Sequence, residues 1–127
     1  MTDILATAQA WVDTDPDPTT QAAGQALIDT GNLSVITDHF GARLKFGTAG
    51  LRGQLGPGPN RMNRALVRKV AAGLGLYLQE NSPDNASKGI VIGFDGRHGS
   101  REFAEDSAGV LMKLGFTVYA FDAVCST

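Results

Sequence analysis

The sequence has one cysteine, one tryptophan and only five prolines among its 127 residues. A single cysteine cannot form an internal disulfide, which is typical of a protein in a reducing, cytoplasmic compartment. No apolar run approaches the roughly 18 to 20 residues that a membrane-spanning helix needs, and the opening residues lack the features of a signal peptide. With 43% hydrophobic residues, the chain is expected to fold as a cytoplasmic domain without a membrane partner.

Positive charge is missing from the first third of the chain. Residues 1–42 contain six aspartates and neither lysine nor arginine, whereas residues 43–69 contain seven basic residues and no acidic one. A net charge of −2 argues against a general affinity for nucleic acid. The basic stretch instead favours local binding of a small anion.

The first 40 residues show the apolar spacing of short helices. Asp17 followed by Pro18 is a favoured start for the second of these helices, and Gly31 is its expected C-terminal stop. Ser34 is then expected to cap a third helix that ends near Gly41. We therefore predict a helical N-terminal lead-in over residues 1–40.

From residue 41 onward, strand and helix patterns alternate. Residues 43–46 alternate as in a strand, and the glycine-rich stretch that follows is expected to be irregular. A helix capped by Asn63 comes next. Its predicted apolar face consists of Leu66, Val70, Leu74, Tyr77 and Leu78. Gly73 and Gly75 within that helix are expected to allow close packing.

A second unit of strand, helix and strand follows the polar loop at 81–88. The apolar run 89–94 is typical of a strand buried on both faces, Ser100 can cap the next helix, and residues 116–121 alternate as another strand. This is the pattern of a βαβ unit with parallel strands. The predicted fold class is a three-layer α/β/α-type domain over residues 41–127, with a mixed or mostly parallel sheet.

The loop from Gly47 to Gly53 is the strongest candidate site. Its flexible backbone can turn several N–H groups toward one anion, Thr48 adds a hydroxyl, and Arg52 can bind phosphate with two nitrogens. The alternative is a turn with a surface arginine. The loop matches neither a Walker A sequence nor a dinucleotide-binding fingerprint.

A second candidate follows the buried strand, where Arg97 could reach a ligand. The alternative, which we favour from the residues alone, is a turn held by a pair between Asp95 and Arg97. Neither His98 nor His39 has the spacing of metal ligands, so no metal site is predicted.

Three further arginines, Arg61, Arg64 and Arg68, recur at helical spacing. Such a stripe is usually a solvated helix face, although an anion near the helix start would offset the dipole there. Ser100, Ser126 and Cys125 have no catalytic partners around them in sequence, so none is predicted to be a nucleophile.

Four segments together resemble the α-D-phosphohexomutases, the family of phosphoglucomutases and phosphomannomutases. The run from Phe46 to Gly53 (FGTAGLRG) is similar to the first active-site signature of that family. The other three segments are Asn60 to Asn63 (NRMN), Ile92 to His98 (IGFDGRH) and Gly115 to Tyr119 (GFTVY). The resemblance covers residues 40–127, and NRMN resembles the bacterial and phosphopentomutase-like branch.

The resemblance implies a four-domain enzyme that moves a phosphoryl group between the 1- and 6-hydroxyls of glucose or mannose. It implies a phosphoserine intermediate, Mg²⁺ and a hexose 1,6-bisphosphate activator for the whole enzyme. Arg52 is implied to act in catalysis by contacting phosphate, with Thr48 and Arg97 as further substrate-binding residues. The serine, metal and sugar-selecting loops of the family do not occur in these residues. The chain alone is therefore expected to be an inactive fragment of domain I that binds no metal.

Two other functions remain open at this point. The chain could be a stand-alone, non-catalytic module that binds a sugar phosphate or a nucleotide, or a pure assembly domain. A fragment of a sheet is also expected to self-associate through an uncovered strand edge or apolar face. The residues expected near that region are Phe116, Val118, Ala120 and Val124.

Overall fold

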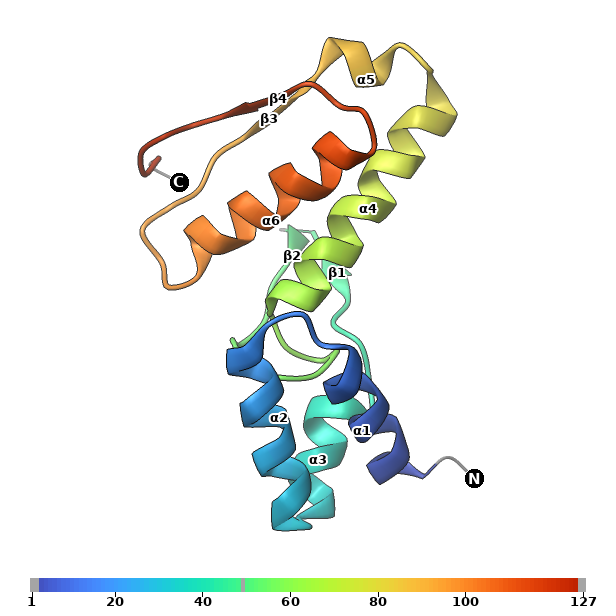
Figure 1. Ribbon diagram of the computed structural model, residues 1–127, viewed down its shortest axis with the longest axis vertical. Helices are drawn as coiled ribbons and strands as arrows, with labels where there is room; N and C mark the ends of the chain where they lie inside the picture. Colours follow the sequence, from blue (N-terminus) through green and yellow to red (C-terminus); the bar gives the residue numbers. More distant parts are fainter. Residues whose placement is uncertain (1–2, 49, 126–127) are drawn as a thin grey trace. The chain divides into compact units, whose positions relative to one another are not determined.

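The computed structural model describes residues 3–48 and 50–125. The sequence predictions that involve Met1, Thr2, Ala49 and Ser126 therefore concern residues outside this description. The chain forms two compact units, one ending at Leu66 and one beginning at Val67 (Figure 1).

The first unit begins with three helices around a small apolar core. They are α1 (Ile4–Thr14), α2 (Pro18–Thr30) and α3 (Leu33–Phe40). The core consists of Ala8, Val12, Ile36 and Phe40. The Trp11 ring meets the Phe40 ring edge to face, with centroids 5.7 Å apart. This is the geometry that aromatic pairs prefer, so α1 and α3 are joined by specific packing.

The acidic residues of this segment include the helix caps. The Asp3 carboxylate accepts from the backbone N–H of Leu5 at the start of α1, and Asp17 does the same for Thr19 at the start of α2. Pro18 is the first residue of α2, which confirms the predicted start. A side-chain oxygen at this position satisfies an N–H group that has no partner within the helix.

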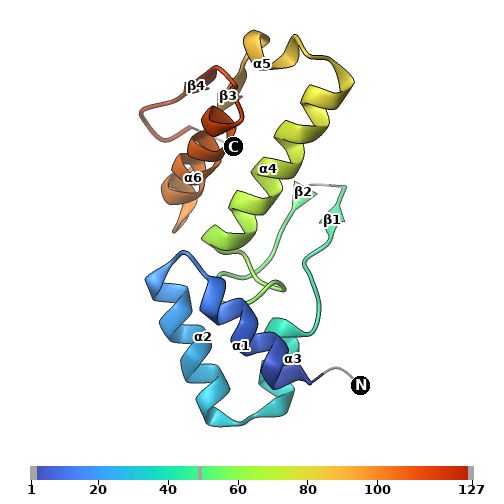
Figure 2. The ribbon, with the colours of Figure 1, turned by 45° about the vertical axis from the view of Figure 1, so that its right-hand side comes forward.

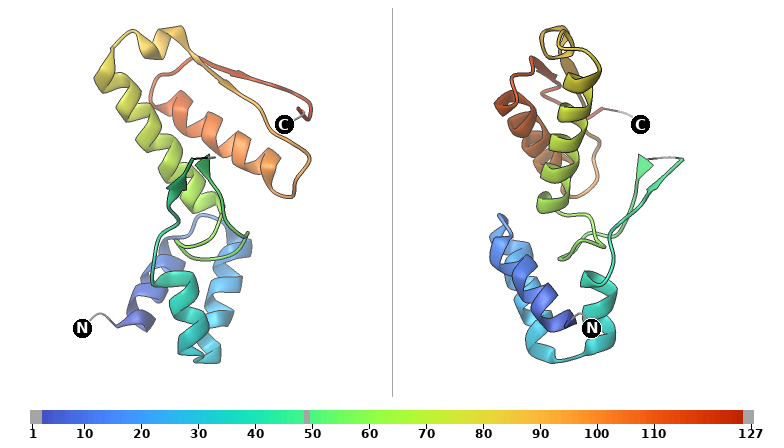
Figure 3. Two further views of the ribbon diagram at one scale, coloured as in Figure 1. Left: turned by 180° about the vertical axis from the view of Figure 1, so that it is seen from behind. Right: turned by 90° about the vertical axis from the view of Figure 1, so that its right-hand side faces the viewer.

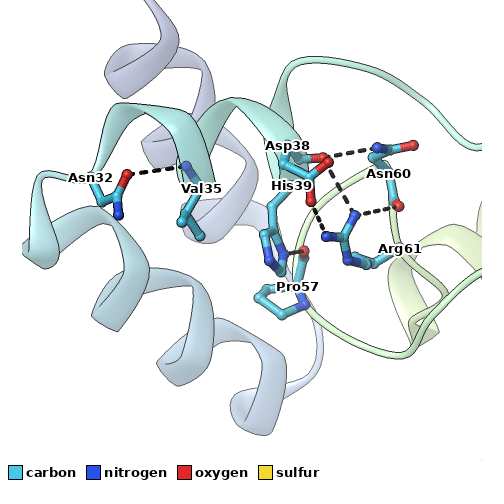
Figure 4. Close-up of polar contacts among 7 residues, drawn as sticks. All are labelled: Asn32, Val35, Asp38, His39, Pro57, Asn60 and Arg61. Carbon is cyan, nitrogen blue, oxygen red and sulfur yellow. Dashed lines mark hydrogen bonds and ion pairs between the residues drawn. The ribbon is translucent and has the colours of Figure 1, made fainter.

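The predicted cap of the third helix was wrong. Gly31 ends α2 in the left-handed conformation, with φ of 69°, as predicted. Only Gly31 and Asn32 separate the two helices. The side chain of Asn32, and not that of Ser34, caps α3 by accepting from Val35 N at 3.3 Å (Figure 4). Ser34 lies inside the first turn of α3.

A β-hairpin follows the helices. Strands β1 (Phe46–Gly47) and β2 (Gly50–Leu51) are antiparallel, with Phe46 opposite Leu51. The prediction of a strand over residues 43–46 followed by irregular backbone was therefore wrong. Gly50, at φ of 90°, adopts a conformation that favours glycine and lets the chain reverse within the signature itself.

The second unit is a βαβ arrangement. Strand β3 (Ile90–Ile92) pairs in parallel with β4 (Val118–Ala120), and α6 (Ser100–Lys113) connects them. Figure 1 shows α6 running alongside this strand pair. The predicted α/β fold class is confirmed. The loop predicted at 81–88 contains the short helix α5 (Asn85–Lys88).

Helix α4 (Arg64–Asn81) does not pack as its apolar pattern predicted. Leu74 and Tyr77 are 49% and 63% exposed, while Ala71 and Gly75 are buried. A side chain at Gly75 would lie 2.7 Å from Leu114 Cδ1, so this glycine permits close packing, as predicted. A side chain at Gly73 would meet nothing within 4 Å, so the same prediction for Gly73 was wrong. The small residues form the contact stripe because the chain around α6 approaches too closely for larger ones.

The parallel strand pair has an exposed apolar face in the described chain. Val91 and Tyr119 lie opposite each other and are 68% and 58% exposed, and Val124 is 62% exposed. The prediction that β3 is buried on both faces was therefore wrong. So was the placement of Phe116 near an uncovered region, because Phe116 is buried at 4% exposure.

Candidate functional site

The hairpin presents the two candidate residues of the glycine-rich loop to solvent. Thr48 lies in the turn and Arg52 directly follows β2, and both side chains are exposed. Figures 2 and 3 show the hairpin standing clear of α1, α2 and α3. A backbone segment of this kind can approach a ligand without displacing other side chains.

The hairpin and the segment before it carry cations that have no partner in the described part of the chain. Arg43, Lys45 and Arg52 are exposed and make no hydrogen bond or ion pair within residues 3–48 and 50–125. Lys45 precedes Phe46 and Arg52 follows Leu51, so the two cations flank the same cross-strand pair. Like charges placed this way repel each other, and an anion between them would remove that cost.

Both ends of the hairpin are attached to the loop that follows it. The backbone N–H of Leu44 donates to the Pro59 carbonyl at 3.0 Å, and that of Met62 donates to the Gln54 carbonyl at 2.7 Å. A side chain at Gly53 would lie 2.7 Å from Leu44 Cδ1, so the two ends also touch each other. The base of the hairpin is therefore fixed from both sides.

Asn63 closes this second loop. Its amide nitrogen donates to the carbonyls of Gly58 and Gly56 at 2.7 and 2.9 Å, and its oxygen accepts from Leu66 N at 2.9 Å. The prediction that Asn63 caps α4 is confirmed. The residue is only 2% exposed, so its replacement would leave several buried polar groups without partners.

The same loop contacts the C-terminal end of α3, as Figure 4 shows. The Arg61 guanidinium pairs with the Asp38 carboxylate, and the Asn60 amide donates to the Asp38 carbonyl at 2.8 Å. His39 Nδ1 lies 2.9 Å from the Pro57 carbonyl, so this nitrogen carries the proton and donates. The hydrogen bond from Arg61 and its positive charge hold the pKa of Asp38 below the ordinary value.

The predicted arginine stripe is not a solvated helix face. Arg61 precedes α4 and is bound to α3, and Arg64 is the first residue of α4. Arg68 donates from its Nη2 and Nε atoms to Asp106 Oδ1, at 3.1 and 3.3 Å. The Asp106 side chain is 7% exposed. These partners lie far away in sequence, which is why the spacing alone gave the wrong interpretation.

The second candidate loop contains the pair between Asp95 and Arg97. Arg97 Nη2 lies 2.6 Å from Asp95 Oδ2, and the Ser100 hydroxyl donates to Asp95 Oδ1 at 2.7 Å. The hydrogen bonds from Arg97 and from Ser100 hold the pKa of Asp95 well below its ordinary value, and the pair raises the pKa of Arg97. Ser100 therefore fixes the loop and does not cap α6, whose N-cap is Gly99.

The structure brings two of the three predicted substrate-binding residues into one element. Thr48 and Arg52 share the hairpin of the first unit, whereas Arg97 belongs to the second unit and is 76% exposed at its side chain. Asp38 and Asn60 were not predicted as members of a site. The Asn60 side chain donates to the backbone carbonyl of Asp38, 22 positions away, and no local pattern signals such a pair.

The described residues contain no group of three or more His, Cys, Asp or Glu side chains that could hold a metal ion. No helix in the described ranges is both long enough and apolar enough to cross a membrane.

Comparison with known protein families identifies the family to which this domain belongs. Residues 43–127 match the model of phosphoglucomutase/phosphomannomutase, alpha/beta/alpha domain I. The chain belongs to this family. The match includes the hairpin, the loop closed by Asn63 and the whole second unit. The resemblance seen in the sequence is thus confirmed.

Curated relatives are phosphomutases of several kinds. The chain is 39% identical to the phosphopentomutase of Homo sapiens, over 95% of the chain and 21% of the relative. It is 37% identical to a probable phosphoribomutase of Schizosaccharomyces pombe, over 92% and 20%. It is 44% identical to a phosphoglucomutase of Staphylococcus haemolyticus, over 80% and 18%. The chain thus spans about a fifth of the length of these relatives. No solved structure matches it significantly.

Proposed function

We propose that this chain is the part of a sugar-phosphate mutase that supplies the first phosphate-binding loop of the active site. The observation that carries the proposal is the exposed Arg52, which has no partner within the described residues and lies on a hairpin whose base is fixed. Fixed cations stabilise the charge of a transferring phosphoryl group without having to reorganise during the reaction.

In this proposal Arg52 is the catalytic residue of the chain and binds a phosphate oxygen through its guanidinium. Thr48, in the turn of the same hairpin, contributes its hydroxyl to the same anion. Arg97 is a weaker candidate for substrate binding because Asp95 already accepts hydrogen bonds from it. The serine that carries the phosphoryl group, donating it to the substrate as phosphoserine and taking one back as serine, would lie outside these 127 residues.

The substrate we propose is a hexose phosphate, glucose or mannose 1-phosphate, converted to the 6-phosphate. A pentose phosphate is the second candidate, because two of the relatives are named phosphopentomutase and phosphoribomutase. The test is a comparison of kcat/KM for glucose 1-phosphate, mannose 1-phosphate and ribose 1-phosphate with the full-length gene product. A clear preference for ribose 1-phosphate would overturn the hexose assignment, and no turnover of any of the three would overturn the proposed function.

Several properties of the whole enzyme belong to the same proposal. The first is a cytoplasmic location. The others are a Mg²⁺ ion and a hexose 1,6-bisphosphate activator, which are bound by parts of the enzyme outside this chain. We also propose a division between a helical lead-in at residues 1–40 and a partial domain I at residues 41–127. The contacts between α3 and the loop at 57–61 would then cross this division.

The competing function is a stand-alone module that binds a sugar phosphate or a nucleotide without catalysis. Two measurements on the purified 127-residue chain distinguish the mutase fragment from the binding module. Glucose 1-phosphate and ATP are titrated into the chain to measure binding, and mutase activity is assayed separately. We expect no interconversion of glucose 1-phosphate and glucose 6-phosphate. Micromolar binding of either ligand by the inactive chain would favour the module instead.

We propose finally that the isolated chain self-associates through the apolar face that contains Val91 and Tyr119. That face is more than half exposed at both residues, and the two-stranded sheet offers unpaired edges to a second copy. Sedimentation velocity over a range of chain concentrations tests this. A monomer at every concentration, equally for wild type and for Val91→Lys, would contradict it.

A further inference from the structure

The position of the signature hairpin depends on a polar contact that lies outside the hairpin. A hairpin of two short strands is marginal by itself in water, so its place is decided by whatever holds its base. Here the base is held by backbone hydrogen bonds from the loop at 56–62 to Leu44 and Gln54. Whatever fixes this loop therefore also fixes the direction in which Arg52 points.

The loop itself is fixed on the last turn of α3. The Asn60 side chain and backbone donate to the carbonyls of Asp38 and His39, at 2.8 and 3.2 Å. Arg61 adds a charge-assisted bond to the Asp38 carboxylate and a longer one, 3.4 Å, to the Asp38 carbonyl. Carbonyls in the last turn of a helix have no partner within it, and a cation there is favoured by the helix dipole.

The fit between the two segments leaves little freedom for adjustment. A side chain at Gly58 would lie 2.3 Å from the His39 carbonyl oxygen, so loop and helix approach as closely as their backbones permit. The Arg61 side chain is 12% exposed although it carries a full charge. A charged group is buried to that extent only when fixed partners replace its water.

We propose that Asp38, Asn60 and Arg61 are positioning residues for the phosphate site. They attach the loop to α3 and thereby set the place of the hairpin that carries Thr48 and Arg52. The N-terminal helices act on the reaction through this contact. The inference rests on the proposed role of Arg52 and adds a set of residues that the signature itself does not contain.

The test uses Arg61→Gln in the full-length gene product. Misplacing a binding group by about 1 Å costs up to roughly 100-fold in rate, so we expect kcat/KM to fall about tenfold or more. Asp38→Arg combined with Arg61→Asp restores the ion pair in reverse and should recover part of the loss. Arg101→Gln, which removes an exposed pair with Glu105, is the matched control and should change kcat/KM by less than about twofold.

Hydrogen exchange distinguishes positioning from a general loss of fold. In Arg61→Gln we expect faster exchange in peptides covering residues 43–56 and unchanged exchange in α6. Faster exchange throughout the protein would overturn the proposal, as would wild-type kcat/KM in Arg61→Gln when Arg52→Ala is impaired. Wild-type activity of Arg52→Ala would instead overturn the proposed function of the hairpin.

Discussion

The hairpin and helix α4 contain the same kinds of residue and use them in opposite ways. Arg52 beside the hairpin is exposed and unpartnered within the described residues, whereas Arg68 on α4 pairs with the nearly buried Asp106. A side chain at Gly50 would meet nothing within 4 Å, whereas one at Gly75 would collide with its neighbours. An exposed arginine without a partner among the described residues is available to a ligand, whereas one paired with a nearly buried carboxylate supports the fold.

The strongest test of this comparison is Arg52→Ala in the full-length enzyme. A charge-assisted contact with phosphate contributes about 1.5–3 kcal/mol, so kcat/KM should fall by roughly 10- to 150-fold. The free energy of unfolding should not change, because the side chain has no partner among the described residues to lose. Steady-state kinetics measures the change in kcat/KM, and urea denaturation measures the free energy of unfolding. Arg101→Ala is the control for both measurements. A fall in stability without a fall in activity would reverse the assignment.

Arg68→Ala should show the opposite behaviour. The substitution removes two hydrogen bonds from the Asp106 carboxylate, which is 7% exposed. We expect a loss of about 1–3 kcal/mol in the free energy of unfolding, reduced by the partial exposure of Arg68. The measurement is urea denaturation, with the exposed Lys69→Ala as control. Equal stability of the two variants would show that this pair does not support the fold.

Two glycines within α4 sharpen the comparison further. In Gly75→Ala the new methyl would lie 2.7 Å from Leu114 Cδ1 and 3.0 Å from Leu111 Cδ2, and overpacking of this kind costs about 1–3 kcal/mol. In Gly73→Ala nothing lies within 4 Å, so the higher helix propensity of alanine should stabilise by up to about 1 kcal/mol. Thermal unfolding of both variants checks the signs. Stabilisation by both would mean that the neighbours of Gly75 move aside.

The smallest expected effect concerns the loop at Asp95. Hydrogen bonds from Arg97 and Ser100 lower the pKa of the Asp95 carboxyl in the folded chain. These contacts therefore stabilise the fold at pH values above the ordinary aspartate pKa of about 3.9. That contribution is lost as the pH falls toward the lower folded pKa. Wild type should therefore lose stability more steeply than Asp95→Asn below about pH 4. Parallel curves for the two proteins, measured by urea denaturation from pH 6 to 2, would show that the pair adds nothing.

Local patterns predicted the elements whose causes are local. Asp17 with Pro18, Gly31 and Asn63 were identified correctly, because a cap or stop depends on a few neighbouring residues. The parallel pair of β3 and β4 also followed from the chain order of strand, helix and strand. The prediction of Ser34 as a cap was wrong by two positions, since α3 begins directly after Asn32, whose side chain caps it.

Contacts between distant residues produced the errors. Two of the five residues expected on the apolar face of α4, Leu74 and Tyr77, are exposed, because packing selected the small residues Ala71 and Gly75 at the closest contact. Arg61 and Arg68 were assigned to solvent because their partners, Asp38 and Asp106, lie 23 and 38 positions away. A charge pattern along the chain contains no information about such partners.

The sequence by itself determined the family, the α/β class and the residues available to bind an anion, because a motif and its spacing are properties of the chain order. The tertiary structure decided which of the basic residues pair with a carboxylate. Arg61 and Arg68 are neutralised by carboxylates that folding brings to them, while Arg52 is left exposed on its hairpin. Pairing depends on distance in space, and only the folded chain sets that distance.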